Sequence, residues 1–358
     1  MSPKLLLLPL SALYGLVVGI RNFMYDKGIF KSISFSVPII CVGNISVGGT
    51  GKTPFTEYII SHLILQGYNI AYLSRGYKRL TSGFIVADKN STPADIGDEP
   101  FQVKQKFPNI TVACDADRVR GVQNLLKLTP VFDVIILDDA FQHRHIKAGY
   151  SIVLVDYNNM IDKDFLLPAG RLRECAKNTK RADFVVVTKY HASSIDTATK
   201  AELSARLNIE KTQGFAVAGI RYSEALPVFP KSSTYELDRI RKEDNILCIT
   251  GIAKPQPYID YLKTFTGNVN TLIFPDHHNF SRKDVENVVK SFAQLPSDGN
   301  NFILTTEKDA VRFQALDYVP DNIKGKMYYT PIKPEIIEEK SNEELFGKLI
   351  EYVEENKG

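Results

Sequence analysis

The chain has 358 residues and a formal net charge of +3, with 44% hydrophobic and 24% charged residues. The length allows two domains, and the composition is that of an ordinary globular protein with ample material for a core. The weak positive charge alone does not indicate nucleic acid, and the sequence contains no RNA- or DNA-binding motif. The four cysteines include no C-x-x-C pair, so we expect reduced thiols rather than disulfides or zinc ligands: Cys41, Cys114, Cys175 and Cys248.

The N-terminal segment carries no charge between Leu5 and Ile20. As a helix it would be about 24 Å long, which is shorter than the ~30 Å hydrocarbon core of a bilayer. A signal peptide has a similar apolar length, but no convincing small-residue cleavage site precedes Arg21. Aromatic and basic residues follow between positions 23 and 31 and suit a membrane interface. We therefore predict a membrane-associated helix within residues 1–30, with a buried core helix as the alternative.

Residues 43–53, GNISVGGTGKT, form a glycine-rich segment between an apolar run at 37–42 and helical spacing at 55–66. Strand, glycine-rich loop and helix, in this order, are the context that a phosphate-binding loop requires. Glycines let backbone N–H groups close around phosphate oxygens, and the helix N-terminus attracts anions. The strict pattern has glycine where Ser46 stands, so a glycine-rich turn with a chance Gly-Lys-Thr is the alternative.

The loop residues have distinct expected roles. Lys52 would reach the β- and γ-phosphates of a nucleotide, and the Thr53 hydroxyl would ligate Mg²⁺. The predicted nucleotide-binding residues are Gly48, Gly49, Thr50, Gly51, Lys52 and Thr53.

Residues 131–139 form an apolar strand that ends in two carboxylates, Asp138 and Asp139. A carboxylate in this position holds the Mg²⁺ that bridges the nucleotide phosphates. Paired acids at a strand end can also cap the following loop, but the upstream glycine-rich segment favours metal binding. The sequence leaves open which of the two carboxylates contacts the metal.

Short apolar strands alternate with helical stretches, which predicts a parallel sheet with helices on both faces. In such sheets ligands bind at the carboxyl ends of the strands. Basic residues gather near several of these ends and suggest an anionic ligand. The expected strands lie at 69–74, 110–114, 131–138, 151–155 and 183–188, and the expected helices at 56–66, 115–128 and 194–207.

A polar, proline-containing connector separates two expected domains. We predict a nucleotide-binding core at 31–214, a connector at 215–244 and a smaller α/β domain at 245–358. The smaller domain has strand candidates at 246–250, 271–274 and 302–306 and ends in an amphipathic stretch at 343–353. Its adjacent histidines, His277 and His278, follow a strand; they could be loop residues, or one could orient a general base.

The sequence resembles the tetraacyldisaccharide 4′-kinase family of the lipid A pathway of Gram-negative bacteria over nearly its whole length. Each shared motif is weak alone, but their order is specific. The family also has a non-glycine residue where Ser46 stands, and it usually has glycine where this chain has Ala140. The motifs are GNISVGGTGKTP (43–54), LSRGYKR (73–79), GDEP (97–100), DADR (115–118), ILDDAFQHR (136–144), LPAGRLRE (167–174), TGIAKP (250–255), FPDHHNF (274–280) and TEKDA (306–310).

The resemblance implies transfer of the ATP γ-phosphate to the 4′-hydroxyl of a tetraacyldisaccharide 1-phosphate, with ATP and Mg²⁺ as cofactors. It also implies a P-loop core joined by a β-ribbon hinge to the smaller domain, at the cytoplasmic face of the inner membrane. The family's catalytic acid matches Asp98 and its partner histidine matches His277.

Other residues in the family motifs have further expected roles. Asp98 could instead cap a helix. The resemblance implies a catalytic role for Lys52 and Arg171, and substrate contacts for Arg75, Arg118 and Glu174. The separate tasks of the arginines stay open, and Glu174 could also lie near the metal.

Two other functions fit part of the pattern. A GTPase usually carries Asn/Thr-Lys-x-Asp after a strand, but here Thr188-Lys189 is followed by tyrosine and histidine. A membrane-bound ATPase or scaffold would explain the apolar helix and the glycine-rich loop, but not GDEP together with FPDHH. Turnover of ATP or GTP without a lipid acceptor would separate these functions from a kinase.

Overall fold

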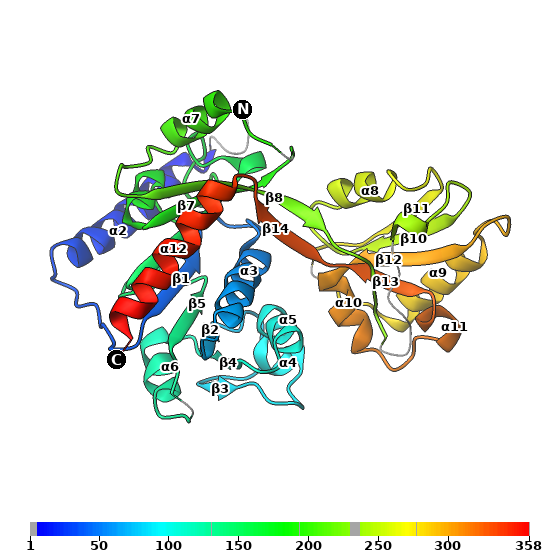
Figure 1. Ribbon diagram of the computed structural model, residues 1–358, viewed down its shortest axis with the longest axis horizontal. Coiled ribbons are helices and arrows are strands. Elements are labelled where there is room, and N and C mark those ends of the chain that lie inside the picture. Colours follow the sequence, from blue (N-terminus) through cyan, green and yellow to red (C-terminus); the bar gives the residue numbers. More distant parts are fainter. Residues whose placement is uncertain (1–5, 130, 193, 230–236, 277, 358) are drawn as a thin grey trace. The chain divides into compact units, whose positions relative to one another are not determined.

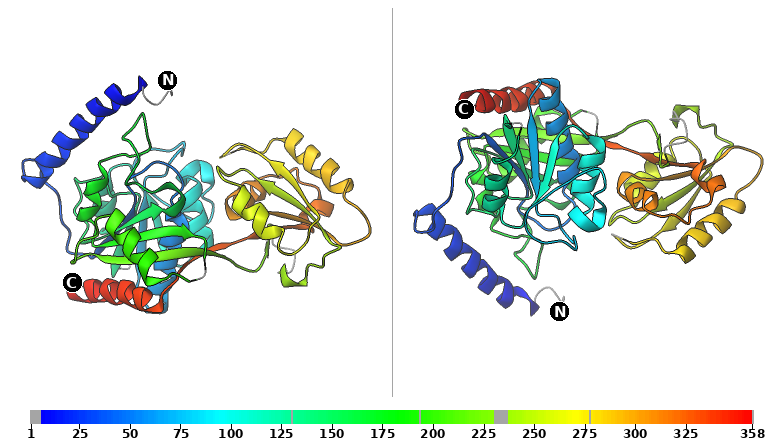
Figure 2. Two further views of the ribbon diagram at one scale, coloured as in Figure 1. Left: turned by 90° about the horizontal axis from the view of Figure 1, so that it is seen from above. Right: turned by 90° about the horizontal axis from the view of Figure 1, so that it is seen from below.

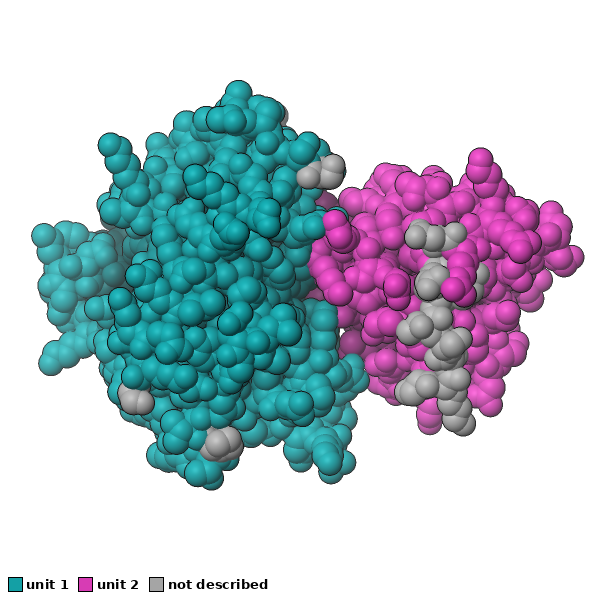
Figure 3. Space-filling model, in the orientation of Figure 1, with its two compact units in different colours: residues 1–220, 334–358 teal, residues 221–333 magenta. Residues whose placement is uncertain are grey.

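The computed structural model describes residues 6–129, 131–192, 194–229, 237–276 and 278–357. The chain forms two compact units, shown in different colours in Figure 3. Unit 1 comprises Met1–Ile220 and Pro334–Gly358, and unit 2 comprises Arg221–Lys333. His277, which the sequence assigns to the catalytic site, lies outside the described residues.

Unit 1 is built on a nine-stranded sheet with the order β14-β8-β7-β6-β1-β5-β2-β4-β3 (Figure 1). The pairs from β8 to β4 are parallel, and β3 is antiparallel to β4. The predicted parallel sheet is confirmed. Its strands are β1 (Ile39–Gly43), β2 (Ile70–Ser74), β3 (Ile85–Val86), β4 (Thr111–Cys114), β5 (Val134–Asp138), β6 (Tyr150–Asp156), β7 (Phe184–Tyr190), β8 (Gly214–Tyr222) and β14 (Ile332–Ile336).

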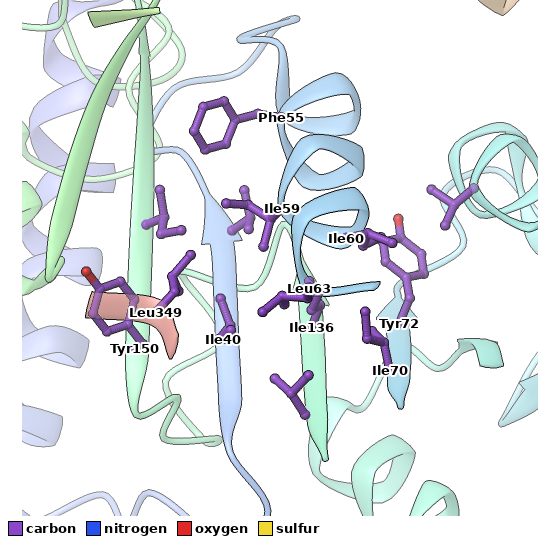
Figure 4. Close-up of a cluster of buried hydrophobic side chains, with 14 of the residues drawn as sticks. Ile40, Phe55, Ile59, Ile60, Leu63, Ile70, Tyr72, Ile136, Tyr150 and Leu349 are labelled. Atoms are coloured by element: carbon purple, nitrogen blue, oxygen red, sulfur yellow. The ribbon is translucent and has the colours of Figure 1, made fainter. Parts of the chain in front are cut away.

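Helices cover both faces of this sheet because its central strands are apolar on both sides. Ile40 and Val42 of β1 join a buried cluster with α3 and α12, part of which Figure 4 shows. Ile39 and Cys41 point to the opposite face and pack in a cluster with α6 and α7. The helices of unit 1 are α2 (Leu8–Asp26), α3 (Lys52–Leu65), α4 (Pro93–Ile96), α5 (Asp98–Lys106), α6 (Arg118–Leu125), α7 (Thr197–Arg206) and α12 (Glu339–Asn356), with 3₁₀ turns at Tyr157–Asn159 and Ala176–Arg181.

Unit 2 contains a five-stranded sheet with the order β11-β10-β12-β13-β9, in which only β9 is antiparallel to its neighbour. The three strands expected from the sequence correspond to β10, β11 and β12. The elements are β9 (Leu226–Pro227), β10 (Asn245–Thr250), β11 (Val269–Ile273), β12 (Asn301–Thr306), β13 (Met327–Thr330), α8 (Gln256–Leu262), α9 (Arg282–Ala293), α10 (Glu307–Gln314), α11 (Asp321–Lys324) and a 3₁₀ turn at Leu237–Arg239.

The C-terminal segment differs from the sequence-based division, which ran the smaller domain from 245 to 358. Residues 334–358 belong to unit 1, to which the chain returns through β14, the neighbour of β8 in the sheet. Leu345, Leu349 and Val353 recur every four residues on one face of α12 and are buried against the cluster that contains Ile40. This contact explains why the segment packs with the larger sheet.

Helix α2 is longer than the charge-free stretch from which it was predicted, and it runs along the outside of unit 1 (Figure 2). Ser11 and Asn22 are its buried residues. Its apolar side chains are largely exposed, including Leu13, Leu16 and Val17 at 60% each. Among the residues that the structure describes, no helix combines the length and apolarity needed to cross a membrane.

Candidate functional site

The glycine-rich loop and the paired carboxylates meet at one edge of the unit 1 sheet. Strand β1 pairs with β5 on one side and with β6 on the other, so the order of the strands reverses around β1. Val42 of β1 lies opposite Asp138 of β5, and the Asp139 N–H donates to the Val42 carbonyl at 2.9 Å. Such a reversal point is where open α/β sheets bind ligands.

The loop after β1 has the backbone that an anion site needs. Gly51 is the N-cap of α3, adopts φ +82°, and supplies no side-chain cap to the first turn of the helix. Free N–H groups at a helix start attract negative charge. Gly43 is also sterically required, because a Cβ there would lie 2.8 Å from the Cβ of Phe141. The turn after β5 therefore packs directly on the start of the loop.

Residues at the end of β7 hold the loop from the other side. The Thr188 hydroxyl donates to the Thr50 carbonyl at 2.7 Å, and the Lys189 ammonium contacts the Gly49 carbonyl. Lys189 also pairs with Asp156 at 3.1 Å. The sequence places Thr188-Lys189 at a strand end and does not complete a GTPase motif there, and it assigns the pair no role in holding the loop. Its position on a parallel strand two places from β1 is the signal that could have identified it.

Asp139 lies among positive charges. The Arg173 guanidinium donates to both of its carboxylate oxygens, and the Lys52 ammonium lies 3.8 Å from Oδ2. Asp139 itself has φ +48°, a conformation that few non-glycine residues adopt. Lys52 of the glycine-rich loop and the second carboxylate thus form an ion pair.

Asp138 has a different environment. Its Oδ2 accepts hydrogen bonds from the Tyr72 hydroxyl at 3.0 Å and the Ser74 hydroxyl at 3.3 Å, whereas Oδ1 is buried without a partner among the described residues. Burial, followed by the charge of Asp139, raises the pKa of Asp138 to about 6. A buried, unpaired carboxylate oxygen is costly and is a natural ligand for a hard cation.

Two residues that were expected to contact the substrate instead form buried hydrogen bonds within the protein. The Arg118 guanidinium donates to the carbonyls of Asp115 at 2.8 Å and Asp138 at 3.1 Å. The buried Glu174 carboxylate accepts from four side chains: Asn22 at 3.1 Å, Gln142 and Asn178 at 2.8 Å, and Arg181 at 2.5 Å. Both residues thereby fix neighbouring elements, and their contacts with substrate stay predictions.

Arg75 is exposed after β2 and lines a cavity of about 250 Å³ next to helix α2. Three arginines contribute to its wall, so the cavity favours an anionic group. The lining residues are Tyr14, Val18, Arg21, Asn22, Arg75, Gln142, Arg173 and Glu174.

Helix α2 is attached to unit 1 by polar contacts near this cavity. The Tyr14 hydroxyl donates to the Arg173 carbonyl at 2.7 Å, and the Ser11 hydroxyl donates to the Leu166 carbonyl at 2.9 Å. The N-terminal helix therefore lines this cavity, which was part of neither the predicted membrane role nor its alternative, a buried core helix.

Arg171 lies in a segment that bonds to the phosphate loop through its backbone. Its carbonyl accepts from the Val47 N–H, and the next arginine, Arg173, donates its own N–H to the Ile45 carbonyl, both at 2.8 Å. The Arg171 side chain pairs with Asp164 at 2.8 Å. Its expected catalytic role is thus a prediction that would require this ion pair to open.

Asp98 is the first residue of α5, and Gly97, with φ +93°, occupies the N-cap position. The alternative reading of Asp98 as a helix cap therefore does not apply. A Cβ at Gly97 would lie 3.0 Å from the Tyr77 carbonyl oxygen, so the start of α5 packs on the turn that follows β2. The catalytic role of Asp98 stays a prediction.

In unit 2, motifs that are distant in sequence meet at the ends of β10 and β12. The Gly251 N–H donates to the buried Asp309 carboxylate at 2.8 Å, which also pairs with Arg312 at 2.9 Å. His278 contacts the Asp284 carboxylate at 3.0 Å, and Asp284 caps α9 together with Ser281. The TGIAKP and TEKDA motifs are therefore joined by a direct hydrogen bond.

Comparisons with known proteins agree in pointing to one family. The sequence profile of the tetraacyldisaccharide-1-P 4′-kinase family matches residues 3–351. Proteins named tetraacyldisaccharide 4′-kinase from Bacteroides thetaiotaomicron and Flavobacterium johnsoniae are each 42% identical; the matches cover 98% of this chain and 93% and 97% of those proteins. The crystal structure of the "apo" form of LpxK from Aquifex aeolicus in complex with ATP matches with a TM-score of 0.75 at 29% identity, over 98% of this chain and 99% of that one.

Proposed function

Because the chain belongs to the tetraacyldisaccharide-1-P 4′-kinase family, we propose that the strand-end site of unit 1 carries out its reaction. The enzyme transfers the γ-phosphate of ATP to the 4′-hydroxyl of a tetraacyldisaccharide 1-phosphate in lipid A biosynthesis. The observation that carries the assignment of the site is the contact of Lys52 with Asp139, next to the buried Asp138.

ATP would bind through the loop from Gly48 to Thr53. Support comes from the left-handed Gly51, the start of α3 without a side-chain cap, and the position of the loop at the reversal of strand order. The Lys52 ammonium, now 3.8 Å from Asp139, would exchange part of this contact for the β- and γ-phosphates.

The donor set suits Mg²⁺, which prefers carboxylate and hydroxyl oxygens. Asp138, Asp139 and Thr53 would hold the ion, and the unpaired Oδ1 of Asp138 supports this assignment. When bound, Mg²⁺ would neutralise charge on the phosphates during transfer. Tyr72 and Ser74 orient the Asp138 carboxylate, and Arg173 orients that of Asp139.

The sugar hydroxyl needs a base to accept its proton during transfer. We assign this role to Asp98, with His277 as its partner, on the basis of the family motifs. The family resemblance implies a hinge between the two units, and its closure on the substrates would exclude water. Arg171 would stabilise charge on the transferred phosphoryl group after leaving Asp164.

The lipid substrate would occupy the arginine-lined cavity with its anionic sugar end. Arg75 is the exposed candidate for a direct contact, whereas Arg118 and Glu174 are buried and would act by holding the surrounding backbone and helix α2. The exposed apolar side chains of α2 would meet the lipid chains and the cytoplasmic face of the inner membrane.

The test is a phosphate-transfer assay with purified protein, ATP labelled at the γ-position and tetraacyldisaccharide 1-phosphate in mixed micelles. Labelled lipid should form with the wild type, and ATP hydrolysis without lipid should be slow. Lys52→Ala should reduce transfer by about 10²–10³-fold without loss of folding. Wild-type transfer by a folded Lys52→Ala variant would contradict the proposed site.

A further inference from the structure

Three side chains outside the phosphate site bring potential metal ligands together: Asp117, His143 and His145. One ligand atom of each lies within 4.8 Å of those of the other two. Asp117 is the N-cap of α6, and the histidines lie in the turn that follows β5. We propose that these three residues form a binding site for a divalent transition-metal ion, with zinc as the best match.

The Asp117 carboxylate can ligate a metal while it caps α6. Its Oδ1 accepts the N–H groups of Val119 at 3.0 Å and Arg120 at 3.3 Å, and within the described part of the chain Oδ2 has no hydrogen-bond partner. The Arg120 guanidinium donates its two hydrogen bonds to Asp115, at 2.8 and 2.7 Å, and interacts with Asp117 through charge alone.

The two histidines are held in a fixed turn. The residue between them, Arg144, donates to the Asn22 carbonyl at 2.8 Å and pairs with Asp26 at 2.7 Å. The His145 carbonyl accepts the Ile33 N–H at 2.8 Å. Because the backbone is anchored on both sides, binding an ion would cost little conformational entropy.

One ring nitrogen of this cluster is buried and unpaired within the described part of the chain. The Nε2 atom of His143 is buried and has no partner among the described residues. A buried polar atom without a hydrogen bond carries a desolvation cost, which bond formation to a metal would remove. The donors are thus two imidazoles and one carboxylate, a set that leaves a fourth tetrahedral position for water.

The surroundings favour zinc over magnesium or calcium. Two of the three donors are imidazole nitrogens, which suit zinc, copper and nickel. Magnesium and calcium instead take mostly oxygen ligands, of which this cluster offers only the Asp117 carboxylate. The site would join the start of α6 to the turn that follows Asp138 and Asp139, and zinc would therefore stabilise unit 1.

The experiment uses tag-free, full-length protein after treatment with a chelator. Calorimetric titration should show one zinc site, cobalt(II) should give visible d–d absorption, and zinc should raise Tm by a few degrees. His145→Ala should weaken binding by at least roughly tenfold and reduce both the cobalt absorption and the Tm shift at a fixed metal concentration. Asp117→Asn, which keeps a cap acceptor, should also weaken binding.

The matched control is His191→Ala, because His191 is another exposed histidine with a polar neighbour, Asn158 at 2.7 Å. This variant and Asp138→Asn should bind zinc as the wild type does, which separates the new site from the phosphate site. Equal binding by wild type and His145→Ala, or no binding by the wild type, would overturn the proposal. The Tm of each variant without metal identifies folding defects.

Discussion

The guanidinium of Arg173 donates to both carboxylate oxygens of Asp139, at 2.7 and 3.2 Å. The same group donates to the Asn44 carbonyl at 2.8 Å. One side chain thus joins the glycine-rich loop to the Asp139 carboxylate. A planar guanidinium has enough donors in a fixed arrangement for all three bonds, whereas an ammonium group acts as a point charge.

Arg173→Lys should therefore retain the positive charge but no longer hold the Asp139 carboxylate in position. We expect kcat/KM for ATP to fall by about 100-fold, because a small displacement of a carboxylate in the site is costly. Steady-state transfer kinetics measure this change. Arg206→Lys is the matched control, since Arg206 forms a similar two-bond pair with Asp162 outside the site. Equal losses in the two variants would contradict a special role for Arg173.

Asp138→Asn should produce an inactive enzyme that is more stable than the wild type at pH 8. The pKa of Asp138 in the folded chain is about 6, above its ordinary value of 3.8, so the charged form is disfavoured by folding. This penalty is complete above pH 6 and disappears as the pH falls through 6 towards 3.8. Two pKa units correspond to about 3 kcal/mol, so urea unfolding without Mg²⁺ should show a gain of this order at pH 8 and little at pH 4.

Asp162→Asn provides a control with the opposite sign. Hydrogen bonding to Arg206 lowers the pKa of Asp162, so its substitution should reduce stability at pH 8. That loss should fade as the pH falls below the ordinary value of 3.8. If the Asp138→Asn variant is also less stable than the wild type at pH 8, the charged Asp138 carboxylate stabilises the fold, and the predicted penalty for burying it is absent.

Replacement of Leu13, Leu16 and Val17 by serine should reduce binding to vesicles of anionic lipid. These side chains are exposed on α2. Each serine substitution removes apolar area that would otherwise enter the membrane surface. The apparent KM for the lipid substrate in vesicles should rise, while ATP binding stays the same. Vesicle sedimentation and transfer kinetics measure both effects.

The control for this triple variant is Leu65→Ser, because Leu65 is 83% exposed at the end of α3. It should leave vesicle binding unchanged. Removal of residues before Phe23 tests the same helix more severely. The two buried clusters of unit 1 contain no residue of α2, so the truncated protein should fold. Failure to fold would mean that α2 is part of the core.

The sheet could be predicted because its central strands are continuous apolar runs buried on both faces, and the loop because glycines and Lys52 stand at fixed positions. The pairing of Arg173 with Asp139 could not be predicted, because it depends on the distant segment around Leu172, which folds back onto the glycine-rich loop at Ser46. The helical pattern of α12 indicated a buried face, but nothing in its spacing specified which of the two sheets this face would pack against.

The last prediction concerns the base. Asp98 lies in a motif of unit 1 and His277 in a motif of unit 2, and we expect them to act as one proton-accepting pair when both substrates are bound. Each single substitution by alanine should lower kcat and leave ATP binding unchanged, because neither residue belongs to the phosphate loop. Asp98→Ala/His277→Ala should then be little worse than Asp98→Ala alone, since residues that act as a unit show non-additive losses.

His278→Ala is the matched control, because the adjacent histidine contacts Asp284 beside the start of α9. A structural histidine should lower Tm and leave turnover per folded molecule nearly unchanged, which is the result expected for His278. The cycle requires saturating lipid and ATP over a pH series, so that kcat reports the substrate-bound enzyme. If the losses from Asp98→Ala and His277→Ala multiply, the residues act independently and His277 does not assist the base.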